Sequence, residues 1–160
     1  MGATSRLDAD GLSVRGSGRV LGIELDMREI GELAPAVAAL CSVAETPSRL
    51  RGLAHIRGHE TDRLAALAQE LTKLGAVVVE HDDGLDIDPA PMRGGRFATY
   101  ADHRMVHAAA IVGLRVPGVL VEDVGTTAKT FPGFERVWES VVSPAPHDDS
   151  ATDESREQVG

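Results

Sequence analysis

The apolar positions along this 160-residue chain change repeatedly between the spacing of a helix and that of a strand. The clearest helix is predicted where leucines recur every three or four residues, and a glycine follows the last of them. These residues are Leu64, Leu67, Leu71, Leu74 and Gly75. Three more helices are expected over residues 32–43, from a cap at Asp102 to about Leu114, and over residues 134–142.

Short runs rich in β-branched and aliphatic residues predict strands between these helices. The expected strands cover residues 12–15, 20–25, 49–56, 76–80, 85–87, 96–100 and 119–124. Units of strand–helix–strand–helix therefore recur as an imperfect repeat, two units and part of a third, which predicts an α/β (α+β) fold class.

The same pattern predicts three regions. Residues 1–18 are polar and glycine-rich, with one short strand, and they begin abruptly inside the repeat, as a truncated lead would. Residues 19–142 form the domain itself. Residues 143–160 are rich in proline, serine and acids, which predicts a disordered acidic tail.

The composition and charge of the chain limit its possible binding partners and its cellular location. The net charge of −9 argues against nucleic-acid binding, and no apolar run approaches the roughly 20 residues needed to cross a membrane. Residues 1–10 lack the apolar core of a signal peptide. The single cysteine, Cys41, excludes an internal disulfide, is expected to be a buried small apolar residue, and favours a reducing, cytoplasmic location.

Charged residues that could form a functional site lie where a predicted strand is followed by a predicted helix. Four such junctions carry charged residues, and helix N-termini favour anions. If the repeats stack in register, the junctions meet at one edge. They hold Glu32; His59, Glu60 and Arg63; Asp102, His103 and Arg104; and Lys129.

Each junction also has an ordinary structural interpretation. Glu60 and Arg63 have the i,i+3 spacing of a surface ion pair, and Asp102 can simply cap its helix. The functional alternative makes Glu60 a general acid or base and makes Arg63, Arg104 and Lys129 contacts for an anionic ligand. His103 and His107 have i,i+4 spacing, but no third ligand is suitably placed, so no metal site is expected.

Taken together, the segments resemble a known family. Arg57-Gly58-His59-Glu60-Thr61-Asp62-Arg63-Leu64, Tyr100-Ala101-Asp102-His103-Arg104-Met105 and Thr127-Ala128-Lys129-Thr130-Phe131-Pro132 are similar, in the same order, to segments of the 5-enolpyruvylshikimate-3-phosphate synthases. The segment from Asp26 to Leu33 resembles the region that carries a catalytic acid in that family. Sibling enzymes that act on UDP-N-acetylglucosamine lack the E-T-D-R run of residues 60–63.

The resemblance implies transfer of the enolpyruvyl group of phosphoenolpyruvate to the 5-hydroxyl of shikimate 3-phosphate, without a cofactor or a metal. By position, it makes Glu32 and Glu60 catalytic. It assigns Arg63, Arg104 and Lys129 to phosphoenolpyruvate, and it assigns Glu32, His59 and, less directly, His55 to shikimate 3-phosphate.

The family fold has two domains of three β-α-β-α-β-β units each, with the active site between them. This chain corresponds to about two units of one domain, so the resemblance implies that the other domain is missing and that the isolated chain has little or no turnover. The alternative is an inactive remnant, or one half of a split enzyme that needs a complementing chain.

Overall fold

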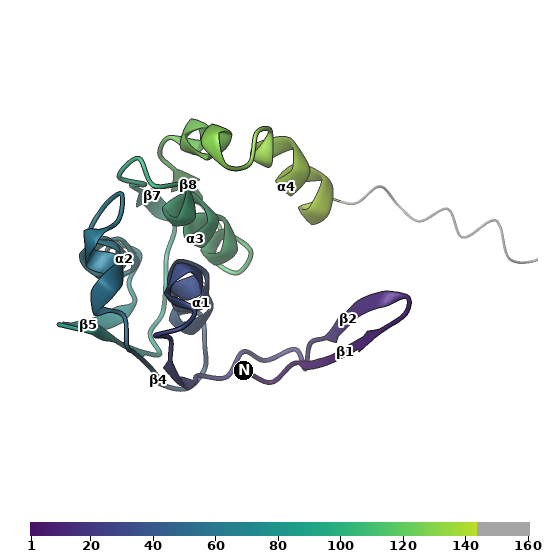
Figure 1. The fold of residues 1–160 in the computed structure, drawn as a ribbon, viewed down its shortest axis with the longest axis horizontal. Helices are drawn as coiled ribbons and strands as arrows, with labels where there is room; N and C mark the ends of the chain where they lie inside the picture. Colours follow the sequence, from purple (N-terminus) through teal and green to yellow (C-terminus); the bar gives the residue numbers. More distant parts are fainter. Residues whose placement is uncertain (144–160) are drawn as a thin grey trace, which may run out of the picture.

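The computed structural model describes residues 1–143, which alternate between strands and helices (Figure 1). The eight strands are β1 (Thr4–Asp8), β2 (Gly11–Arg15), β3 (Glu24–Asp26), β4 (Ser48–Arg51), β5 (Val77–His81), β6 (Gly84–Asp88), β7 (Gly95–Phe97) and β8 (Val119–Val121). The α-helices are α1 (Ala34–Ser42), α2 (Arg63–Lys73), α3 (His103–Gly113) and α4 (Phe134–Val142). Short 3-10 helices η1 (Gly31–Leu33), η2 (Ala54–Gly58) and η3 (Val124–Lys129) precede α1, α2 and α4.

The strands form three separate sheets. The central sheet has the order β3-β4-β6-β5, with β3 and β4 parallel and the other pairs antiparallel. The other two are the antiparallel hairpin β1-β2, which projects from the body, and the parallel pair β7-β8 (Figure 1). The order from β3 to β6 is therefore one complete βαβαββ unit, and β7, α3, β8 and α4 begin the same order again, which confirms the predicted α/β (α+β) class and its repeat.

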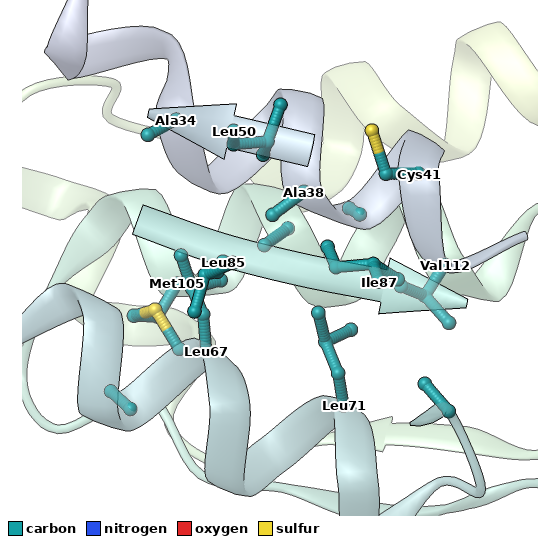
Figure 2. Packing of buried hydrophobic residues seen from close by; sticks show 14 of the residues in the cluster. Ala34, Ala38, Cys41, Leu50, Leu67, Leu71, Leu85, Ile87, Met105 and Val112 are labelled. Atoms are coloured by element: carbon teal, nitrogen blue, oxygen red, sulfur yellow. The ribbon is translucent and has the colours of Figure 1, made fainter. Parts of the chain in front are cut away.

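The apolar core lies between the central sheet and the helices α1, α2 and α3. Figure 2 shows Leu85 and Ile87 of β6 facing Leu67 and Leu71 of α2, and all four are fully buried. The residues of α1 in this core are mainly alanines, together with Cys41, which is buried and free as predicted. Small side chains let α1 pack closely against α3, since a larger residue there would need space that the core lacks.

Local sequence explains where the helices begin and end. The carboxylate of Asp62 accepts a hydrogen bond from the backbone N–H of Ala65 at 3.1 Å and so caps α2, and Gly75, with φ of 103°, turns the chain after it. Asp102 caps α3 in the same way. The predicted helix over residues 134–142 is confirmed with the same bounds.

Several predicted strands are shorter than expected. The strand over residues 49–56 ends at Arg51, because Gly52 adopts a left-handed φ of 76° and η2 follows. The strand over residues 20–25 is reduced to Glu24–Asp26, since the N–H groups of Gly22 and Ile23 bond instead to the hydroxyls of Thr46 and Ser48. The strand predicted over residues 96–100 ends at Phe97, and the one over residues 119–124 ends at Val121.

The N-terminal region holds two strands and not the single short strand expected over residues 12–15. The helix predicted over residues 32–43 is divided, because Gly31–Leu33 forms η1 and the α-helix begins only at Ala34. The predicted acidic tail lies outside the described residues, apart from Ser143. Within residues 1–143, every helix is too short or too polar to span a membrane.

We expect Leu71→Ala to destabilise the protein by about 2–5 kcal/mol, because the substitution leaves a cavity against β6. Leu40→Ala, at an exposed position of α1, is the matched control and should cost well under 1 kcal/mol. Urea unfolding followed by circular dichroism measures both. Equal losses of stability would contradict the packing described for α2.

Candidate functional site

Arg63, the first residue of α2, is the centre of a cluster of charged side chains. Its side chain is only 1% exposed. Its Nε donates to Asp102 at 2.6 Å, its Nη2 donates to Glu60 at 2.7 Å, and its Nη1 donates to Glu32 at 3.1 Å. Each nitrogen of the guanidinium therefore has a carboxylate partner, and the three carboxylates come from three different segments of the chain.

Asp102 has two roles in this arrangement. Its Oδ1 caps α3 by accepting from the N–H of Arg104 at 2.9 Å, and its Oδ2 accepts from Arg63. The side chain is fully buried. A carboxylate is stable there because both the helix N-terminus and the guanidinium compensate its charge. Sequence reasoning predicted the cap but missed the contact with Arg63.

Glu32 connects the two arginines. Its carboxylate forms ion pairs with Arg63 and with the Nε of Arg104, although the angle at Arg104 is not that of a hydrogen bond. Arg104 also donates to the backbone oxygen of Glu32 at 3.0 Å. Partial burial favours the neutral acid, but Arg63 and Arg104 outweigh it and lower the pKa of Glu32 below its usual value. At neutral pH this carboxylate is ionised.

Two histidines border the same cluster. The Nδ1 of His59 lies 2.7 Å from Nη1 of Arg63 and 3.0 Å from Oε1 of Glu32, so it accepts from Arg63 when deprotonated and donates to Glu32 when protonated. His55 lies with its ring 6.3 Å from that of His59. Its imidazole packs so closely on Gly31 that a Cβ at residue 31 would collide with Nε2, which explains the glycine next to Glu32.

Two residues of the quoted segments lie apart from this cluster. Lys129 is exposed at the end of η3, and within residues 1–143 no hydrogen bond or ion pair joins it to Arg63, Arg104 or Glu32. Arg57 binds Asp62 at 2.8 Å and Glu80 at 2.7 Å, which ties η2 to β5. Three of the four predicted junctions thus meet at one place, and the junction of Lys129 is not joined to them.

A second buried acid supports the segment that leads to Asp102. Glu70 is fully buried in α2 and accepts from the hydroxyl of Tyr100 and, at 3.0 Å, from the N–H of Ala98. Burial and the neighbouring Glu70 raise the pKa of Tyr100 to about 12. Sequence reasoning missed this pair, although a signal was present, because Glu70 shares the apolar face of α2 with Leu67 and Leu74.

The chemistry available here is anion binding next to carboxylates. Two guanidinium groups, Arg63 and Arg104, are balanced by the acids Glu32, Glu60 and Asp102. A bound anion would have to replace one of these acids, and Glu60 and Glu32 are half exposed while Asp102 is not. Residues 1–143 hold no group of three His, Cys, Asp or Glu side chains placed for a metal ion.

Comparison with known proteins gives a consistent result. A family model described as EPSP synthase (3-phosphoshikimate 1-carboxyvinyltransferase) matches residues 1–138. A 3-phosphoshikimate 1-carboxyvinyltransferase of Kocuria rhizophila is 57% identical over 141 residues, which are 88% of this chain and 32% of that protein.

Solved structures share the fold at lower identity. An EPSP synthase of Acinetobacter baumannii superposes with a TM-score of 0.72 at 23% identity, over 87% of this chain and 35% of that one. The enolpyruvyl transferase NikO of Streptomyces tendae gives a TM-score of 0.63 at 20% identity, over 85% and 31% of the two chains. The chain spans about a third of the length of these relatives. Since the family model covers most of the sequence and the fold agrees, the chain belongs to the EPSP synthase family.

Proposed function

We propose that this chain supplies one side of the active site that transfers the enolpyruvyl group of phosphoenolpyruvate to the 5-hydroxyl of shikimate 3-phosphate, in the biosynthesis of chorismate and aromatic amino acids. The observation that carries the proposal is the convergence of Arg63, Arg104, Glu32 and Glu60 at the N-terminal ends of α2 and α3. Both substrates are anions, and converging guanidinium groups in an otherwise acidic chain give them a local site.

The reaction needs three proton movements. The 5-hydroxyl loses a proton as its oxygen bonds to the central carbon of phosphoenolpyruvate, and the methylene carbon gains one, which gives a tetrahedral intermediate. Loss of one proton from the resulting methyl group and cleavage of the carbon–oxygen bond to phosphate then restore the double bond and release inorganic phosphate. The residues nearest to these tasks, in this proposal, are Glu32 and Glu60.

Glu32 is suited to accept the hydroxyl proton, because its lowered pKa keeps it ionised at neutral pH. Glu60 takes the role of acid and base at the methylene carbon. His59 and His55 lie beside Glu32, where shikimate 3-phosphate would bring its hydroxyl. Arg63, Arg104 and Lys129 are assigned to phosphoenolpyruvate, with Lys129 the assignment that has the least geometric support.

Binding of phosphoenolpyruvate requires a rearrangement of the cluster. Every nitrogen of Arg63 already has an acidic partner, so the ligand must displace Glu60 or Glu32, both of which are half exposed. Displacement moves Glu60 from Arg63 toward the ligand. The same exchange would therefore expose the cation and free the catalytic acid.

The relatives are about three times as long as this chain, so we propose that a second body, in the same protein or in a complementing chain, closes the site. A cytoplasmic location belongs to this proposal, since the one cysteine of the chain is free and buried.

A chimera can test the assignment of Glu60. The 141-residue segment of the Kocuria rhizophila relative is replaced by the matching segment of this chain, and phosphate release is measured with both substrates. Glu60→Gln should lower kcat by about 10²–10⁴-fold, because the proton donor is lost. Glu29→Gln, at an exposed acid three residues before Glu32, is the control and should leave kcat unchanged. An active Glu60→Gln chimera would rule out this role.

In the same chimera, Arg104→Lys should raise KM for phosphoenolpyruvate by about 10–100-fold, since lysine keeps the charge but loses the planar fork. The KM for shikimate 3-phosphate should change less. Arg28→Lys, at an exposed arginine whose one ion pair within residues 1–143 is with Asp26, serves as the control. An equal rise of both KM values would indicate that Arg104 only holds the cluster together.

The isolated 160-residue chain should release no phosphate from the two substrates above the rate of a blank. Addition of the part of the Kocuria rhizophila relative that the alignment leaves uncovered should restore turnover if the chain is half of a split enzyme. Turnover by the chain alone would refute the one-sided site, and no turnover even after addition would favour the inactive remnant.

A further inference from the structure

All three sheets have free edges within residues 1–143, but two of the sheets have only two strands. The central sheet has four strands, but β1-β2 and β7-β8 have two each. A free edge presents unpaired N–H and C=O groups that can pair with another strand. Each free edge can therefore be matched to the strand that would pair with it.

The β1-β2 hairpin corresponds to the β5-β6 hairpin of the complete repeat unit. In β1-β2, Asp8 pairs with Gly11 and Thr4 pairs with Arg15, and in β5-β6, His81 pairs with Gly84 and Val77 pairs with Asp88. Both hairpins have the same length and the same two-residue turn. Asp10-Gly11-Leu12 and Asp83-Gly84-Leu85 are identical, and Val14 corresponds to Ile87.

The edge of β6 opposite β5 shows which kind of strand the hairpin can pair with. That edge pairs with β4 in the register Ser48–Ile87, Arg49–Asp86 and Leu50–Leu85. Gly84 approaches β4 so closely that a Cβ there would collide with the carbonyl oxygen of Leu50. Gly11 occupies the same place in β2, where nothing lies against it, although its own φ of 126° also favours glycine.

The edge of β8 is the counterpart of the edge of β4. Both strands pair in parallel with the strand before them. Leu50 and Val121 both face the helices, and each lies two residues before a residue with a left-handed φ, Gly52 and Asp123. Val121 therefore corresponds to Leu50, and Leu50 is fully buried beside β6, whereas Val121 is only partly buried.

The side chains of the two repeat units also correspond. Leu85 and Ile87 are buried against Leu67 and Leu71 of α2 (Figure 2). At the equivalent place in the second unit lies a cavity of about 330 Å³ between α3, β8 and α4. Trp138 and Val142 line it from α4, with the same four-residue spacing as Leu67 and Leu71.

The side chains that would fill this cavity are present in the chain but lie elsewhere. Leu12 and Val14, the counterparts of Leu85 and Ile87, are 67% and 64% exposed. Their own hairpin is fixed at its base, since Gly22 binds Thr46 and Arg19 pairs with Glu45 at 2.6 Å. Figure 1 shows the hairpin projecting from the body, away from β8 and α4.

We propose that the β1-β2 hairpin of one copy of this chain pairs with the edge of β8 in a second copy and inserts Leu12 and Val14 into the cavity between α3 and α4. The expected register places Leu12 opposite Val121 and Ser13 opposite Leu120. The contact joins two different surfaces, so each copy still offers one hairpin and one edge, and the assembly either closes into a ring or extends.

Light scattering after size exclusion tests the assembly with the full chain. The mean mass should rise with concentration above the 16.9 kDa of a monomer. Val14→Asp should return it to the monomer value, because a carboxylate would enter the cavity. Ser13→Asp adds the same charge to the opposite face of β2 and is the matched control, which should still assemble.

A disulfide test fixes the register and the identity of the occupant. Two single variants, Ser13→Cys and Leu120→Cys, are mixed and oxidised, so only a bond between different chains can form. The expected pair is a non-hydrogen-bonded one, with Cα atoms close enough for a disulfide, and Cys41 is buried and does not compete. Cross-linking should be at least tenfold faster than with Val119→Cys in place of Leu120→Cys.

Two results would overturn the proposal. One is a monomer at every concentration, as expected if residues 144–160 or another part of the same chain fill the cavity. The other is cross-linking of Ser13→Cys at equal rates to the two positions of β8, which would indicate random collision.

Discussion

The burial of one guanidinium group is the constraint on which the rest of the site depends. A charge removed from water is tolerated only when it is fully paired, and Arg63 meets this condition with carboxylates from η1, from the turn before α2 and from the start of α3. The three segments belong to both repeat units. Arg63 therefore fixes how the helix starts lie relative to one another, and the same contacts bring together every charged group that the proposed reaction uses except Lys129.

The parts of the fold that could be predicted are those with a local cause. The leucine spacing of α2, its glycine stop and the acid caps of α2 and α3 act within a few residues, and these helices were expected close to their observed bounds. Strand ends depend on longer-range pairing, and β4 stops at a glycine whose left-handed φ no apolar pattern indicates. The N-terminal hairpin has its first strand among polar residues, so alternation alone did not reveal it.

The contacts of the site also divide into those that the sequence predicts and those that it does not. The residues around Arg63 were expected to converge from their positions at helix starts and from the family resemblance, and the structure brings Glu32, His59, Glu60 and Arg104 around it. The contact of Arg63 with Asp102 spans 39 residues, so neither position alone indicates it. Lys129 was expected at the same edge, but η3 leaves it exposed and unconnected to the cluster within residues 1–143.

The backbone just before α3 gives this arrangement a mechanical property. Tyr100 and Ala101 both have positive φ, 54° and 55°, which costs about 1–2 kcal/mol for each residue with a side chain. The strained pair is held at both ends, by the hydroxyl of Tyr100 on Glu70 and by the carboxylate of Asp102 on Arg63. The two contacts offset this cost, so the left-handed pair depends on Glu70 and Arg63 for its stability. The segment that carries Arg104 into the site is therefore held from both repeat units.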